Sequence, residues 1–122
     1  MQEKIKINFK GKNYVSREMT PGVFVDAEKL KSLLSGSQYG GIYRMGTSLG
    51  DEALTIVDME AYFSILFPEL INDLKPKSIG ELNVNDFKEL RKVYRSEVTK
   101  WVNSYIKLLK EVENDESPEK GN

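Results

Sequence analysis

Residues 53–67 read ALTIVDMEAYFSILF, and this run decides the fold. Its polar members are few: Thr55, Asp58, Glu60 and Ser64. A helix that is apolar on most of its circumference has to be packed on several sides. The run is shorter than the roughly 20 apolar residues of a membrane-spanning helix, and it contains two carboxylates. We therefore predict a buried helix at the centre of a domain, and no membrane segment.

The flanks of the run mark the ends of this helix. Asp51 and Glu52 follow Gly50 and suit a helix N-terminus, where carboxylates meet the positive end of the helix dipole. Pro68 clashes with the preceding turn, so it is expected to stop or kink the helix. Residues 69–74 are then expected to continue as another short turn.

The N-terminal residues predict a β-hairpin. Ile5, Ile7 and Phe9 alternate with polar residues, as in a half-buried strand. A turn signal follows at residues 10–13, where Gly11 is able to adopt a positive φ angle. Residues 14–17 return as a second strand. Because two strands alone are marginal in water, the hairpin is expected to lean on the helices.

Two further helices are predicted, one on each side of the central one. Thr20 suits an N-cap before Pro21 at the first helical position, and Gly36 ends that helix. Asn83 caps the last helix, expected from about residue 84 to about residue 113 and therefore roughly 45 Å long. Its apolar positions alternate three and four apart, as on an a/d seam: Phe87, Leu90, Tyr94, Val98, Trp101, Tyr105, Leu108 and Val112. We expect Trp101 to belong to the core.

The predicted fold class is α+β and mostly α: an N-terminal β-hairpin followed by three main helices, the last one long. Residues 1–113 are expected to form a single helical domain. Residues 35–50 hold five glycines and are predicted to be a flexible loop, and residues 114–122 a disordered acidic tail. A domain of this size is roughly 35 Å across, so the end of the last helix should protrude or need a partner.

Composition excludes several classes of function. The 122 residues include no cysteine and no histidine, which removes thiolate chemistry, histidine general bases and almost every zinc site. The formal net charge of −1 argues against a dedicated nucleic-acid binder. The N-terminal residues lack the apolar core of a signal peptide, so a cytoplasmic location is expected.

The remaining candidates for chemistry are weak. Asp58 and Glu60 are two residues apart and do not share a helix face, so we interpret them as part of a solvated strip and predict neither a metal site nor a cofactor. The basic stretch of the last helix, which includes Arg91 and Arg95, has a nucleic-acid face as its less favoured interpretation. Ordinary pairs on the helix surface are preferred, with Asp86 or Glu89 beside Lys92 and Glu97 beside Lys100. A carboxylate-metal hydrolase stays open as a minor alternative.

A family resemblance becomes visible once the last two helices are read together. The pattern is YFSILFPELINDL at residues 62–74, SIGEL at residues 78–82, then Tyr94 and Trp101. It resembles the small tail assembly chaperones of long-tailed phages and prophages of Gram-positive bacteria. The length and the opening strand with Gly11 are also similar, and the likeness covers most of the chain outside residues 36–50.

The resemblance implies a helical, non-enzymatic protein of the infected bacterial cytoplasm that is absent from the mature virion. Its partners would be the tape measure protein, which it coats, and the tail tube protein, whose subunits it recruits. A homo-oligomer is also expected, and no nucleic acid. The alternative function is a bacterial regulatory or adaptor module that binds a partner helix. The positions predicted to bind partners lie on the end of the last helix and in the glycine-rich loop: Tyr105, Leu108, Leu109, Val112, Tyr39 and Tyr43.

Overall fold

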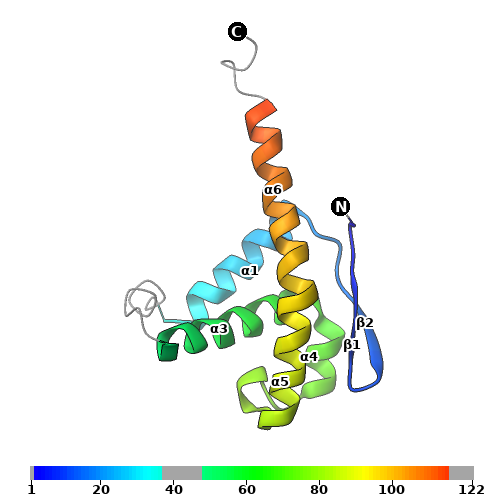
Figure 1. Cartoon of the computed structure of the whole chain (residues 1–122), viewed down its shortest axis with the longest axis vertical. Helices are drawn as coiled ribbons and strands as arrows, with labels where there is room; N and C mark the ends of the chain where they lie inside the picture. The colour runs from blue at the N-terminus through cyan, green and yellow to red at the C-terminus, as the bar shows by residue number, and fades with distance from the viewer. Residues whose placement is uncertain (1, 37–47, 116–122) are drawn as a thin grey trace.

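The computed structural model describes residues 2–36 and 48–115 (Figure 1). The elements in chain order are β1 (Lys6–Phe9), β2 (Lys12–Val15), α1 (Pro21–Leu34), α3 (Ser48–Leu66), α4 (Pro68–Leu74), a 3₁₀ turn (Ile79–Glu81), α5 (Val84–Val93), a π-helical turn (Tyr94–Val98) and α6 (Thr99–Asp115). The fold is mostly helical with an N-terminal antiparallel hairpin and a long last helix, so the predicted fold class is confirmed.

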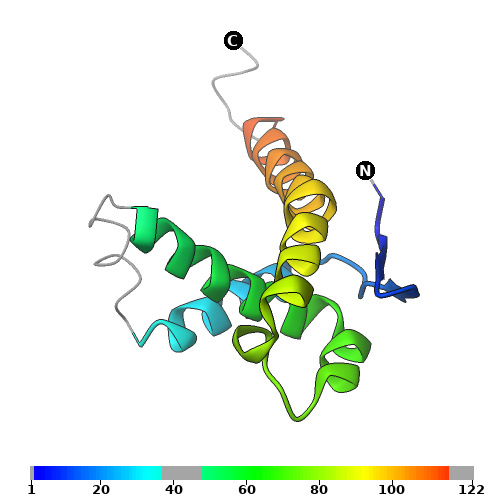
Figure 2. The ribbon, with the colours of Figure 1, turned by 60° about the horizontal axis from the view of Figure 1, so that its bottom comes forward.

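The helices pack as a pair crossed by one long rod. Helix α1 lies along α3, and the continuous helix made of α5, the π turn and α6 crosses them (Figures 1 and 2). The upper part of α6 stands clear of the other helices, as expected from its length. Within the described ranges, no helix combines the length and the apolar character needed to cross a membrane.

The hairpin closes through a two-residue turn. Phe9 pairs with Lys12, so Lys10 and Gly11 alone form the loop, with φ angles of 52° and 79°. Positive φ at both central positions is the type I′ geometry that matches the twist of the flanking strands. The positive φ predicted for Gly11 is confirmed, while the turn is shorter than residues 10–13 because Lys12 already belongs to β2.

The hairpin leans on the helices, as its marginal size requires. Its Lys10 ammonium lies 3.1 Å from the Asp86 carboxylate, and the Lys10 backbone N–H donates to Glu89 at 2.9 Å. The prediction that these two acids pair with Lys92 is therefore wrong. Both are taken up by the hairpin, a partner about 75 residues away in the sequence that helix spacing cannot reveal.

A second anchor joins the hairpin to α4. The Asp73 carboxylate accepts from the Lys12 ammonium at 2.7 Å and from the Tyr14 hydroxyl at 2.8 Å. These two donors, Lys12 first, hold the pKa of Asp73 below its ordinary value of 3.8. A carboxylate whose pKa is depressed by folding stabilises the fold above its unfolded pKa, and that contribution is lost as the pH falls through the folded pKa.

We therefore expect Asp73→Asn to destabilise the protein at neutral pH, because the carboxylate charge between Lys12 and Tyr14 is gone. The difference in unfolding free energy between wild type and variant should stay constant above about pH 5 and shrink below pH 4. Urea denaturation from pH 7 to pH 3 measures it. The exposed Glu18, which has no ion pair among the described residues, supplies the control variant Glu18→Gln. A wild-type-to-variant difference that does not change with pH would contradict the expectation.

The predicted helix boundaries hold at three places. The Thr20 hydroxyl accepts from the Val23 N–H at 3.2 Å, and the Asn83 side chain accepts from the Asp86 N–H at 2.8 Å. Gly36, just after α1, has φ of 60°, the left-handed conformation that ends many helices. These caps satisfy N–H and carbonyl groups that a helix terminus would otherwise leave without partners.

The central helix differs from its prediction at both ends. Helix α3 starts at Ser48, three residues before Asp51, so residues 48–50 of the predicted loop are helical. Pro68 ends it as expected, but α4 is a full seven-residue helix with that proline in its first turn. At the other end of the chain, α6 continues to Asp115, two residues into the predicted tail. The rest of the predicted loop and tail lies outside the described residues.

The last helix contains a turn that the sequence did not predict. Residues Tyr94–Val98 are π-helical, and the Thr99 N–H donates to the Tyr94 carbonyl five residues earlier. Such a turn accommodates one extra residue and rotates the rest of the helix about its axis. It brings Val98 and Trp101 onto the buried side together with Leu90.

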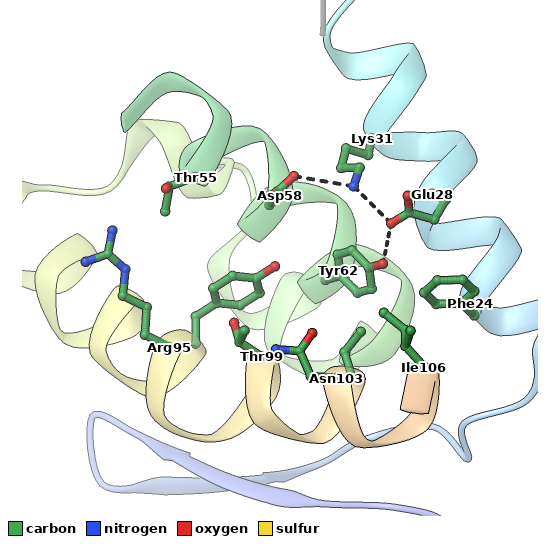
Figure 3. Close-up of a pocket in the computed structure, with 12 residues that line it drawn as sticks. Phe24, Glu28, Lys31, Thr55, Asp58, Tyr62, Arg95, Thr99, Asn103 and Ile106 are labelled. Carbon is green, nitrogen blue, oxygen red and sulfur yellow. Dashed lines mark hydrogen bonds and ion pairs between the residues drawn. The ribbon is translucent and has the colours of Figure 1, made fainter. Parts of the chain in front are cut away.

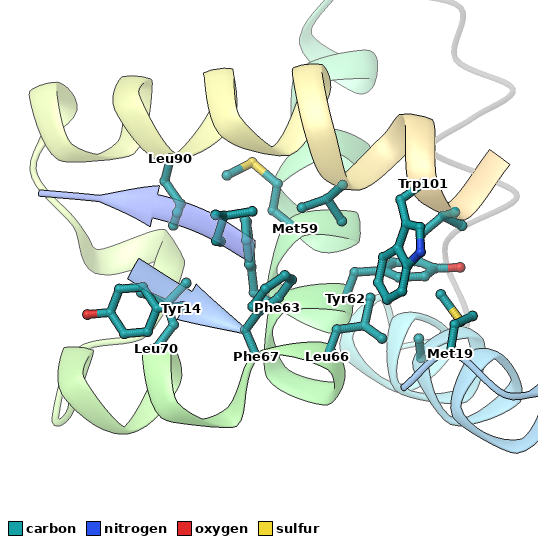
Figure 4. Close-up of a cluster of buried hydrophobic side chains, with 14 of the residues drawn as sticks. Tyr14, Met19, Met59, Tyr62, Phe63, Leu66, Phe67, Leu70, Leu90 and Trp101 are labelled. Carbon is teal, nitrogen blue, oxygen red and sulfur yellow. The ribbon is translucent and has the colours of Figure 1, made fainter. Parts of the chain in front are cut away.

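The core is built around α3 and closed by the long helix (Figure 4). The largest fully buried side chains are Phe63, Phe67, Ile7, Met59, Leu66, Leu70, Ile79, Leu90 and Val98. Four of them come from the apolar run at residues 53–67, so its burial is confirmed. Trp101 is 6% exposed and donates through Nε1 to the Gln2 carbonyl at 2.7 Å, which places it in the core as predicted.

Candidate functional site: a groove beside the long helix

A cleft of about 430 Å³ opens where α1, α3 and the long helix meet (Figure 3). This volume lies within the usual range of ligand sites. Its walls are formed by Phe24, Glu28, Lys31, Thr55, Asp58, Tyr62, Tyr94, Arg95, Thr99, Val102, Asn103 and Ile106. They come from three segments far apart in the sequence, so the folded arrangement alone creates the cleft.

One wall is a chain of paired polar groups from α1 and α3. The Tyr62 hydroxyl donates to the Glu28 carboxylate, and the Lys31 ammonium lies 3.0 Å from Glu28 and 3.8 Å from Asp58 (Figure 3). Burial, and then the Glu28 carboxylate, raise the pKa of Tyr62, so this phenol stays protonated and remains a donor. The charges on this wall are largely satisfied inside the protein.

The predicted solvated strip on α3 is therefore only partly correct. Asp58 is half-buried and faces Lys31 across the helix pair. Glu60 is also half-buried, and it accepts a hydrogen bond from the Ile79 N–H at 3.0 Å. Both carboxylates hold elements together, which their positions in the sequence did not indicate.

The facing wall belongs to the long helix. Arg95, Thr99, Asn103 and Ile106 follow one another along it at intervals of three or four residues (Figure 3). Side chains at this spacing share one helix face. Near Ile106 the cleft becomes apolar, because Phe24 of α1 packs there against the buried Tyr105 ring, with 6.0 Å between the ring centroids.

A second hollow, of about 470 Å³, continues the cleft toward the start of the long helix. It is lined by Lys88, Arg91, Lys92, Arg95 and Ser96, and Arg95 is common to both hollows. The Arg91 guanidinium lies 2.5 Å from the Glu52 carboxylate. The other three cations have no ion pair among residues 2–36 and 48–111, for which side chains are described.

We call the two hollows together the long-helix groove. Its long-helix wall runs from Lys88 to Ile106 along one face, which corresponds to roughly 27 Å at 1.5 Å per residue. The groove is cationic at its α5 end, and polar with apolar side chains at its α6 end. Such a length and mixture of groups suit a polypeptide segment better than a small compact ligand.

A smaller hollow lies elsewhere on the surface and is almost entirely apolar. It measures about 190 Å³ and is lined by Ile56, Gly80, Leu82, Val84 and Phe87. Val84 is 73% exposed, the highest value on its rim. It has room for about one large side chain and does not connect to the long-helix groove through any shared lining residue.

The positions predicted to bind partners fall into three groups. Tyr105 is buried, and its hydroxyl has no hydrogen-bond partner among the described residues. Leu108 and Leu109 are 39% and 37% exposed on the protruding part of α6. Val112 belongs to α6, but its side chain lies outside the description, and Tyr39 and Tyr43 lie outside the described residues altogether. Partner binding at these positions stays a prediction.

The groove could not be predicted from the sequence of any single helix. The spacing of Lys88, Arg91, Lys92 and Arg95 along one face was a usable signal, and it was interpreted as an ordinary charged surface. Nothing local indicated that Glu28 and Asp58 face that helix. Among the described residues, no group of three or more acidic side chains is placed to hold a metal ion. The chemistry the groove offers is therefore hydrogen bonding, ion pairing and apolar contact.

Comparison with known proteins gives no assignment: no family model, curated protein or solved structure matches this chain.

Proposed function

We propose that this protein is a non-enzymatic tail assembly chaperone of a long-tailed phage or prophage. It binds the tape measure protein in the bacterial cytoplasm, helps recruit tail tube subunits, forms a homo-oligomer and is absent from the finished virion. The observation that carries the proposal is the long-helix groove, an elongated site with no catalytic group that the sequence could supply other than carboxylates, lysines and hydroxyls.

The groove suits a helical partner. A helix presents side chains about three and four residues apart, and the groove wall offers groups at the same interval along roughly 27 Å. Apolar contacts to Phe24 and Ile106 would anchor such a helix, and Asn103 and Thr99 would hydrogen-bond its flank. Helix-in-groove binding is a recurrent mode of peptide recognition.

The resemblance supports the fold side of the proposal. Its positions Phe63, Leu66, Phe67 and Leu70 are fully buried, and Trp101 is nearly so. A pattern made of core positions reports on a shared architecture and says little about which surface binds the partner. The groove supplies that second part.

The proposal predicts a stable complex with the tape measure protein encoded beside this chain. Co-expression with tagged tape measure protein should keep it in solution and capture the untagged chaperone. Asn103→Trp places a large ring in the groove and should lower capture at least about tenfold, or ~1.4 kcal/mol. Ser104→Trp adds the same ring on the next residue, which is exposed and does not line the groove, so it should leave capture unchanged.

The outcomes separate the proposal from its alternative, the adaptor module that binds a partner helix. A large tape measure gene just downstream, together with capture that only Asn103→Trp impairs, supports the chaperone. Absence of any complex with the tape measure protein would refute it. Capture of a different helical partner with the same sensitivity to Asn103→Trp would favour the adaptor.

A further inference from the structure

The α5 end of the long-helix groove concentrates positive charge that the described part of the protein does not neutralise. Lys88, Lys92 and Arg95 are exposed there, three and four residues apart, and the paired Arg91 lies between them. Like charges at this spacing repel each other across a helix face. The nearest acids in the sequence are engaged or turned away: Glu89 accepts from Lys10, and Glu97 does not line the groove.

The other end of the groove has the opposite preference. Glu28 and Asp58 place two carboxylates in its wall, and Phe24 and Ile106 add apolar surface. A nucleic acid carries phosphates along its whole length and would meet these carboxylates, and the chain as a whole has a net charge of −1. A small anion would occupy the α5 end alone and leave the remaining length unused.

We infer that the long-helix groove binds an amphipathic α-helix with acidic residues at one end, and that these carboxylates lie over Lys88, Lys92 and Arg95. The inference rests on the proposed function and defines the chemistry of the tape measure segment that is bound. Carboxylates three and four residues apart on that helix match the spacing of the three cations when the two helices lie side by side. The apolar face of the same helix covers Phe24 and Ile106.

The test uses labelled peptides of about 30 residues that together span the tape measure protein, titrated with the full chain. The peptides that bind should be acidic amphipathic helices. The groove variant Lys88→Glu/Lys92→Glu/Arg95→Glu should weaken their binding at least about tenfold at low salt. The matched control Lys29→Glu/Lys100→Glu/Lys107→Glu changes the net charge equally at exposed lysines outside the groove, and should change binding by less than about twofold. Reversing the acidic residues of the peptide to lysine should restore binding to the groove variant.

The possible failures are distinguishable. Peptide binding that is equal in the wild type, the groove variant and the control overturns this inference and leaves the proposed function standing. Lack of binding by any tape measure peptide overturns both. Tighter binding of a single-stranded DNA 30-mer that the groove variant abolishes would identify a nucleic-acid site instead. Melting temperatures of the two variants close to that of the wild type exclude unfolding as the cause.

Discussion

Replacing Phe63 with alanine is expected to lower the free energy of unfolding by about 3–5 kcal/mol. The side chain is 0% exposed and lies where α3, α4 and the long helix meet. Its ring centroid is 5.8 Å from that of Phe67 and 5.5 Å from that of Tyr94. Alanine would remove both ring contacts and leave a cavity among side chains from three elements, which cannot all collapse into it.

Such a loss is a large share of the total stability, because domains of this size unfold with about 5–15 kcal/mol. Thermal and urea denaturation should place the Phe63→Ala midpoint about 10–20 °C below that of the wild type. Leu33→Ala is the control, since Leu33 is 76% exposed and should change stability by at most about 0.5 kcal/mol. Equal, small effects of both substitutions would show that the core is not centred on α3.

Much of this core could be predicted because its signals are local. The run around Phe63 is too apolar for anything but burial, and the spacing of Leu90, Val98 and Trp101 marks one side of a helix. The caps at Thr20 and Asn83 and the hairpin turn at Gly11 depend on residues next to one another in the chain. Each of these predictions needed only a short window of sequence.

The features that the sequence did not reveal depend on residues far apart. The pairing of Asp86 and Glu89 with Lys10, and of Glu52 with Arg91, joins segments that meet only after folding. The π turn escaped prediction because its apolar spacings of three and four also fit an ordinary α-helix. The long-helix groove combines both difficulties, since its walls come from three helices.

The prediction that best tests the link between the hairpin end and the long helix concerns Trp101. We expect Trp101→Ala to lower the free energy of unfolding by about 3–5 kcal/mol, because the buried indole leaves a large cavity. Trp101→Phe keeps most of the ring but loses the hydrogen bond to the Gln2 carbonyl, so about 1 kcal/mol should be lost from that bond. Urea denaturation of both variants gives the two values.

The neighbouring position provides the control. Lys100 is exposed, and Lys100→Ala should change stability by no more than about 0.5 kcal/mol. A core role for Trp101 requires the order alanine, phenylalanine, wild type in rising stability, with capture of the tape measure protein falling only as far as the fold is lost. If Trp101→Ala left stability near the wild-type value while capture failed, the indole would be a contact for the partner. The end of the long helix, rather than the groove, would then be the binding surface.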